Sequence, residues 1–261
     1  MKDIFKYTFL TVAEIKKFLF VVILISIFSI LQAFPVISIV SFFFEKLLYL
    51  SIGVLLIYLI KITNNDKEYF ATLEKQPFST FLLHFIPSAI GILLGFFIIF
   101  FVFASFFIII LKFTNSIFIL ANPHDLLFAI SKTSLIAQTL LGFYSVYLLF
   151  YSYIFLGKFG EALSKETFKD SFLSIVSSLF DFKFWINTFN LKYMGIYFIW
   201  NIIIIFTYSI VIFAYLFYIF PMISVHLNST LLFIPLLVAI TTILTYFTFF
   251  SAYFAYKTAK D

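Results

Sequence analysis

The sequence predicts an all-α, polytopic membrane protein, a transmembrane bundle of about six helices. Apolar residues make up 64% of the 261-residue chain and charged residues only 11%, whereas soluble domains average about half and about a quarter. A soluble fold of this length could not bury so much apolar surface, because its size limits its interior. The apolar residues also gather into runs of roughly 20 residues, the length that a helix needs to cross a bilayer.

Six apolar runs are long enough to cross a membrane, and we expect the whole chain, 1–261, to form one transmembrane domain. Pro35 lies near the far end of the first run, and Pro87 allows the long third run to bend. The expected spans are about 18–40, 44–60, 81–111, 135–156, 193–220 and 231–256.

The distribution of lysines predicts the orientation of these spans. The chain has no arginine, and with a cytoplasmic N-terminus 14 of its 17 lysines fall in cytoplasmic segments. Only Lys46, Lys112 and Lys132 are then left on the outer side. Cytoplasmic loops of membrane proteins carry an excess of basic residues. We therefore expect both termini in the cytoplasm.

Two cytoplasmic segments, 1–17 and 161–192, have apolar residues at helical spacing and predict amphipathic helices at the membrane interface. In the second segment we expect Ser164 and Asp181 to cap two helices, because Ser and Asp are favoured at the N-cap. The apolar side chains would anchor these helices in the lipid bilayer, or would dock a cytoplasmic or membrane protein partner. The candidate anchoring or docking residues are Phe168, Phe172 and Trp185.

Glu45 and Lys46 are the charged residues closest to the membrane interior, where a charge is costly and marks a functional site. If the first hairpin turns around Pro35, they lie inside the second helix and could serve ion or substrate passage. If it turns at 38–43, they lie at the outer headgroups, and the cost of a buried charge favours this placement. Because neighbours on a helix point about 100° apart, we expect the two to have different partners.

His124, Asp125 and His226 are expected on the outer side, where imidazole and carboxylate groups could hold a divalent cation such as zinc. The histidines lie in separate loops without helical ligand spacing, so we interpret them as ordinary loop residues. The chain has no cysteine, no Gly-rich phosphate loop, no GxSxG and no HExxH. We therefore expect no cofactor and no metal. Because the lysines are scattered at helix ends, we also expect no nucleic-acid partner.

Four residues within the spans are candidates for helix packing. Gly91 and Gly95 form a small-xxx-small pair, which lets another helix approach closely. We expect that helix to belong to the same bundle rather than to a second copy of the chain. Gln138 and Asn201 are amides that we expect to be buried and to hydrogen-bond across helices.

A tyrosine-rich span is followed by three further patterns in the stretch 144–205. These are Gly157-Lys158-Phe159-Gly160-Glu161-Ala162, then Leu179-Phe180-Asp181-Phe182, then Lys192-Tyr193-Met194-Gly195. With the breaks at Phe34-Pro35 and Ile86-Pro87, the outline resembles a loosely defined group of six-helix membrane proteins. That group is similar to the membrane region attached to some glycerophosphodiester phosphodiesterases. The resemblance implies an inner-membrane helical bundle without an assigned reaction or catalytic residue.

These features predict a non-enzymatic membrane component, related to transport or envelope assembly, that acts with partners. The prediction depends on the near absence of charge within the spans and on the amphipathic segments at the cytoplasmic side. An autonomous small transporter or channel using Glu45 is the alternative. A membrane-embedded enzyme would depend on the His124, Asp125 and His226 group.

Overall fold

The computed structural model describes residues 1–63, 77–114, 133–214 and 228–260, with Glu68, Ala71, Thr72, Lys75 and Phe217 between these ranges. Helices make up most of this part of the chain and no strand occurs in it, which confirms the all-α class. The helices are α1 (Lys2–Ala13), α2 (Ile15–Leu31), α3 (Ser38–Ile62), α5 (Phe78–Phe113), α8 (Leu135–Leu163), α9 (Phe168–Ser177), α10 (Phe182–Asn187), α11 (Leu191–Ala214) and α13 (Asn228–Lys260).

Five helices, α3, α5, α8, α11 and α13, are long and apolar enough to cross a membrane. Each corresponds to one of the predicted spans, so the chain is a multi-pass membrane protein. The observed helices are longer than several of the predicted spans. α8, for example, continues to Leu163 instead of ending near residue 156.

The first hairpin, formed by α2 and α3, turns earlier than expected. α2 ends at Leu31 and α3 begins at Ser38, so the turn surrounds Pro35 and the favoured turn at 38–43 is wrong. Proline has no N–H to donate and disfavours helical backbone in the residue before it, which ends the helix here. The predicted span 18–40 is therefore a 17-residue helix, about 26 Å long, that packs against α3.

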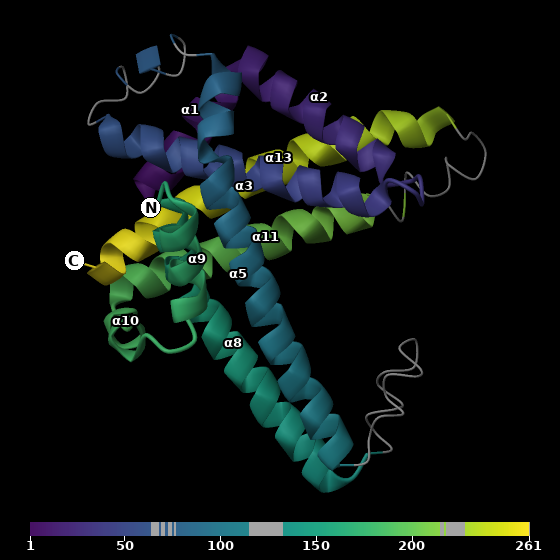
Figure 1. Ribbon diagram of the computed structural model, residues 1–261, viewed down its shortest axis with the longest axis vertical. Helices are drawn as coiled ribbons and strands as arrows, with labels where there is room; N and C mark the ends of the chain where they lie inside the picture. The colour runs from purple at the N-terminus through teal and green to yellow at the C-terminus, as the bar shows by residue number, and fades with distance from the viewer. Residues whose placement is uncertain are drawn as a thin grey trace.

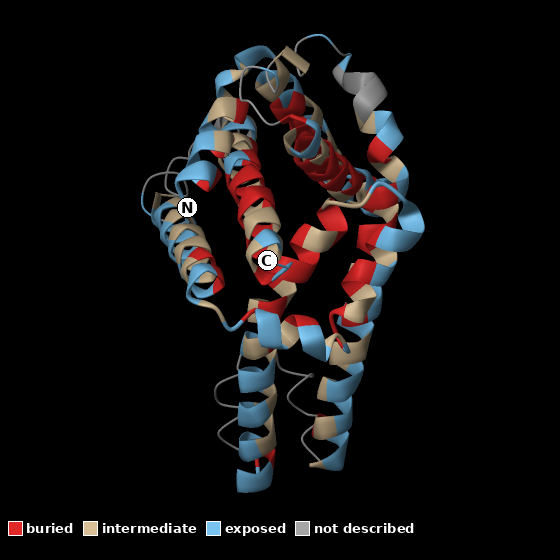
Figure 2. Ribbon diagram, turned by 90° about the vertical axis from the view of Figure 1, so that its left-hand side faces the viewer, coloured by how far each residue is buried: buried red, intermediate tan, exposed pale blue. Residues whose placement is uncertain are grey.

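Two groups of helices meet at one end of the molecule and diverge toward the other (Figure 1). The four-helix layer consists of α2, α3, α11 and α13, and the α5–α8 hairpin consists of α5 and α8. α5 crosses the layer and continues beside α8, and the lower halves of these two helices project from the rest (Figure 2). Both termini, α9 and α10 lie at the end where the groups meet (Figure 1). The two termini therefore lie close together at this end of the molecule, and their cytoplasmic placement stays a prediction.

α3 is the most enclosed of the five long helices. In its most apolar window 67% of the residues are buried, against 6% in α11. Ile52, Leu55, Leu56 and Ile57 are almost completely buried. A helix that is apolar all round can be covered by protein on every side, and α3 packs against α2 and α13 of its own layer and against α5 and α8 of the hairpin.

Gly91 and Gly95 of α5 pack against α9 rather than against another long helix. A Cβ atom on Gly95 would lie 2.7 Å from the Ile175 side chain, and one on Gly91 would meet the Phe168 carbonyl. The Ser88 hydroxyl lies 2.6 Å from the Ser171 hydroxyl in the same contact. The glycines thus pack within the chain, as predicted, and let α9 rest on the backbone of α5.

Candidate functional site

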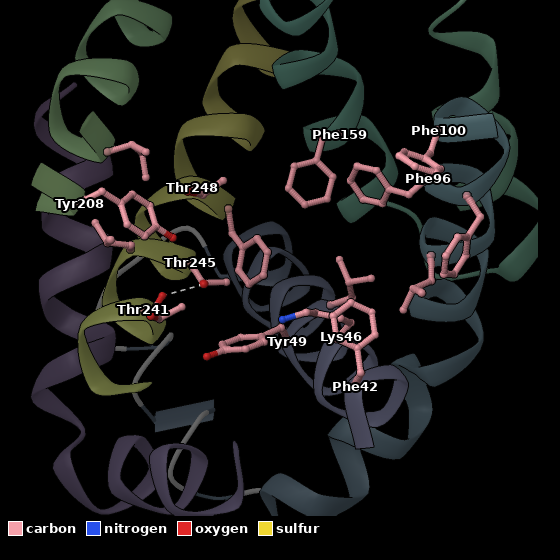
Figure 3. A pocket seen from close by; sticks show the side chains of 16 residues that line it. Phe42, Lys46, Tyr49, Phe96, Phe100, Phe159, Tyr208, Thr241, Thr245 and Thr248 are labelled. Atoms are coloured by element: carbon pink, nitrogen blue, oxygen red, sulfur yellow. Dashed lines mark hydrogen bonds between the residues drawn. The ribbon is translucent and has the colours of Figure 1, made fainter. Parts of the chain in front are cut away.

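A cleft of about 620 Å³ separates the four-helix layer from the α5–α8 hairpin (Figure 3). Ligand pockets in proteins measure roughly 300–1,000 Å³ and are mostly apolar with a few polar groups, and this cleft matches both properties. Half of its 16 lining residues are aromatic, and four others carry polar groups. The aromatic residues are Phe42, Tyr49, Phe96, Phe97, Phe100, Phe159, Tyr208 and Phe249. The remaining polar residues are Lys46, Thr241, Thr245 and Thr248.

Lys46 is the charged residue that lines the cleft, and its ammonium forms an ion pair with Glu45. Because the hairpin turns around Pro35, both residues lie within α3, about 10 Å from its first residue. The Lys46 Nζ lies 3.3 Å from Glu45 Oε1, while Gln32 Nε2 donates to the other carboxylate oxygen. The prediction that the two have different partners is wrong, because the long lysine stem bends back to its neighbour.

The two members of this pair differ in exposure. The Lys46 side chain is 42% exposed, whereas the Glu45 side chain is 10% exposed. The Lys46 ammonium also lies 5.1 Å from the centre of the Phe42 ring and 5.8 Å from that of Tyr49, within the range of cation–π attraction. The carboxylate is therefore enclosed and the ammonium faces the cleft among aromatic rings.

Thr241, Thr245 and Thr248 form a row of hydroxyls on the α13 wall of the cleft (Figure 3). The Thr245 hydroxyl donates to the Thr241 carbonyl at 2.7 Å, and the Thr248 hydroxyl accepts from Trp200 Nε1 at 3.1 Å. Sequence reasoning missed this row. Its signal is visible, since three threonines at positions i, i+4 and i+7 share one face of an otherwise apolar helix.

A second charged group, the Lys158 cluster, lies at the end where the helix groups meet. The buried Lys158 Nζ contacts Glu161 Oε2 at 2.8 Å and Asp181 Oδ2 at 2.6 Å, and it lies 4.6 Å from the Phe184 ring centre. Asp181 caps α10 through the Phe184 amide, as predicted. Partial burial raises the pKa of Asp181, but the hydrogen bonds from Lys158 and Phe184 outweigh it and hold the pKa below its usual range.

The three patterns that carry the family resemblance meet around this cluster. Tyr193 Oη accepts from the Gly157 amide at 2.9 Å and donates to the Tyr153 carbonyl at 2.6 Å. Lys158 comes from the first pattern, Asp181 from the second and Tyr193 from the third. These contacts join α8, α10 and α11, so we interpret the cluster as structural rather than as a binding site.

Several predicted residues have other surroundings than expected. Gln138 is exposed and donates to the Thr133 carbonyl at 3.2 Å, so its predicted burial is wrong. Asn201 is half-buried and donates within its own helix, to the Tyr197 carbonyl at 2.9 Å. Thr167, not Ser164, caps α9.

The predicted anchoring residues lie on the two short helices, Phe168 and Phe172 on α9 and Trp185 on α10. Phe168 is exposed and stacks on Phe172, with ring centres 6.0 Å apart. Trp185 is half-buried, and its Nε1 donates to the Ser178 carbonyl at 2.9 Å. Trp185 therefore holds α10 against the end of α9, and whether it also anchors the chain in lipid or docks a partner stays a prediction.

The candidate metal ligands His124, Asp125 and His226 lie outside the described residues. Within the described ranges, no three His, Asp or Glu side chains come together to hold a metal ion. The cleft lining itself contains no histidine and no carboxylate.

The chain was compared with protein-family models, with curated proteins and with solved structures. None of these comparisons finds a match. The resemblance to six-helix membrane proteins therefore stays a prediction.

Proposed function

We propose that the chain is a transport-related component of the cell (inner) membrane that binds a lipid-like molecule in the cleft. The observation that carries this proposal is the cleft of about 620 Å³ between the four-helix layer and the α5–α8 hairpin, with its aromatic lining. Aromatic and aliphatic walls favour apolar ligands, because binding removes apolar surface from water or from looser lipid contacts.

The chemistry of the lining supports binding rather than catalysis. None of the lining residues is a histidine, cysteine or carboxylate, the side chains that most often act as general acids and bases or as nucleophiles. Ion passage is also disfavoured by the apolar walls. The alternative of an autonomous transporter or channel depends on Glu45. This residue does not line the cleft, and its two carboxylate oxygens contact Gln32 and Lys46.

A cytoplasmic or membrane protein partner remains part of the proposal. Large apolar side chains stay exposed between the end of α9 and the start of α11, where a partner or the bilayer would cover them. They are Phe180, Phe182, Ile186, Phe189 and Leu191. Mass spectrometry of the tagged protein, isolated from its membrane in mild detergent, would identify a stoichiometric partner.

A steric block tests the proposal. Thr245→Trp places a large ring in the cleft, whereas Ile243→Trp places the same ring on an exposed position of the same helix outside the lining. Binding of a fluorescent phospholipid to the purified protein should weaken about tenfold or more, equivalent to ~1.4 kcal/mol, in Thr245→Trp alone. Equal binding by both variants and the parent chain would overturn the proposal.

A further inference from the structure

We infer that the cleft selects an anionic lipid, one whose headgroup carries a net negative charge on a phosphate or carboxylate, and that the Lys46 ammonium is the group that recognises it. This inference rests on the proposed function and adds the ligand's charge to it. Lys46 is the only charged residue among the 16 that line the cleft. An amphipathic ligand would place its chain between the aromatic walls and its charged end at this one cation.

The ammonium has free capacity to bind an anion. An ammonium group has three N–H donors, and Glu45 takes one of them at 3.3 Å. The Phe42 and Tyr49 rings near Nζ attract the cation without accepting a conventional hydrogen bond. Because the side chain is 42% exposed, the remaining donors can reach a phosphate or carboxylate that enters the cleft.

Glu45 acts as a positioning residue in this arrangement. Its carboxylate is 10% exposed and is held by Gln32 from the end of α2. It therefore fixes the ammonium at the wall of α3, while it presents little negative charge to a ligand. Among the described residues, α5, α8, α11 and α13 bring no carboxylate to the lining.

The contrast with the Lys158 cluster supports this interpretation. Lys158 contacts two carboxylates, Glu161 and Asp181, and is buried, so its charge is satisfied within the protein. Lys46 has one carboxylate contact among the described residues and faces a cavity that can hold a ligand. A cation placed in this way beside apolar walls matches an amphipathic anion.

Lipid selectivity of the purified full-length protein tests the inference. The probes are phosphatidylglycerol and phosphatidylcholine with identical acyl chains, titrated and followed by native mass spectrometry. We expect the parent chain to bind phosphatidylglycerol about tenfold more tightly, the range expected for a hydrogen bond to a charged group. Lys46→Met should remove this preference, and Lys46→Arg, which keeps the charge, should retain it.

Lys61→Met is the matched control, because Lys61 lies on the same helix, is 40% exposed and pairs with Glu166 at 3.7 Å outside the cleft. Its lipid preference should equal that of the parent chain. Equal binding of the two lipids by the parent chain would overturn the anionic selectivity and leave the proposed function standing. Failure to bind either lipid would overturn both. Inorganic phosphate is the third probe, and binding as tight as that of phosphatidylglycerol would overturn the lipid assignment.

Discussion

At the scale of single residues, the chain uses its few internal charges in two ways. Lys158 of α8 is enclosed with Glu161 of the same helix and with Asp181 at the start of α10, and so it ties these two helices together. Lys46 is held by one buried carboxylate and remains open to the cleft. Removing one carboxylate from Lys158 should cost stability, because the buried ammonium then keeps only one of its two charged partners. The two lysines should therefore respond differently to mutation.

Substitutions at Asp181 separate its charge from its capping role. Asp181→Asn keeps a good N-cap and loses the ion pair, so we expect the free energy of unfolding to fall by about 1–3 kcal/mol. Asp181→Ala also loses the cap to the Phe184 amide, which adds about 1 kcal/mol. Thermal unfolding in a non-ionic detergent measures both changes. Equal stability of the Asn variant and the parent chain would show that the pair contributes nothing.

The lowered pKa of Asp181 predicts a dependence of stability on pH. Its pKa in the folded protein lies below the unfolded value because Lys158 and the Phe184 amide stabilise the carboxylate. The contribution is therefore present above the unfolded pKa of about 4 and is lost as pH falls through the folded value. The melting temperature of the parent chain should fall more steeply than that of Asp181→Asn as pH drops below about 4. Parallel curves would contradict this assignment.

At the scale of elements, the contact between α5 and α9 explains why the segment after α8 folds back on the long helices. Three small residues of α5, Ser88, Gly91 and Gly95, lie under α9. Close approach of two backbones requires small side chains where they meet. Because α9 also packs against α8, this contact helps to hold α5 and α8 together.

A single added methyl group tests this contact. Gly95→Ala would place a Cβ atom 2.7 Å from the Cβ of Ile175, and overpacking of this kind costs about 1–3 kcal/mol. Gly142→Ala, in α8, meets nothing within 4 Å and should be neutral or stabilising, since alanine favours a helix over glycine. The melting temperatures of the two variants should therefore move apart. A stable Gly95→Ala protein would mean that α9 does not rest on α5 in this way.

Many features of the individual helices can be predicted from local sequence. The Asp181 cap, the close approach at Gly91 and Gly95, and five long helices follow from short-range patterns. The helix that packs on Gly91 and Gly95 could not be predicted, because any helix can pack on a small-xxx-small surface. The first span was predicted to end too late, at about residue 40, because the apolar run continues past Pro35 although the helix ends at Leu31. The burial of Gln138 was overestimated, because a position inside a span does not reveal which face meets protein.

At the scale of the whole molecule, the arrangement of the helices in Figure 1 predicts which segments lie on opposite sides of the membrane. The turn at residues 32–37 lies at the end of α3 opposite to α9 and α10. Because the chain has no cysteine, single cysteines can report on each side. Val36→Cys should react with a membrane-impermeant thiol reagent in intact cells, and Phe180→Cys only after permeabilisation; both positions are exposed. The reverse pattern would contradict cytoplasmic termini.

The cleft is the feature that sequence reasoning could not supply. Its walls come from α3, α5, α8, α11 and α13, so residues as distant in sequence as Phe42 and Phe249 line one space. Lys46 was recognised as a residue of interest, but its exposure to a cavity depends on how α5 diverges from the layer. Long-range geometry of this kind leaves no local signal in a single sequence.

The central claim is that a lipid occupies this cleft, and photo-crosslinking tests it most directly. A phospholipid with a photoactivatable group in its acyl chain would be bound to the protein in membranes and crosslinked. Mass spectrometry would then locate the modified residues. We predict adducts concentrated on cleft residues such as Phe96, Phe100 and Thr245. Adducts confined to outward-facing residues such as Ile202 and Ile205 of α11, which are exposed and do not line the cleft, would contradict the claim.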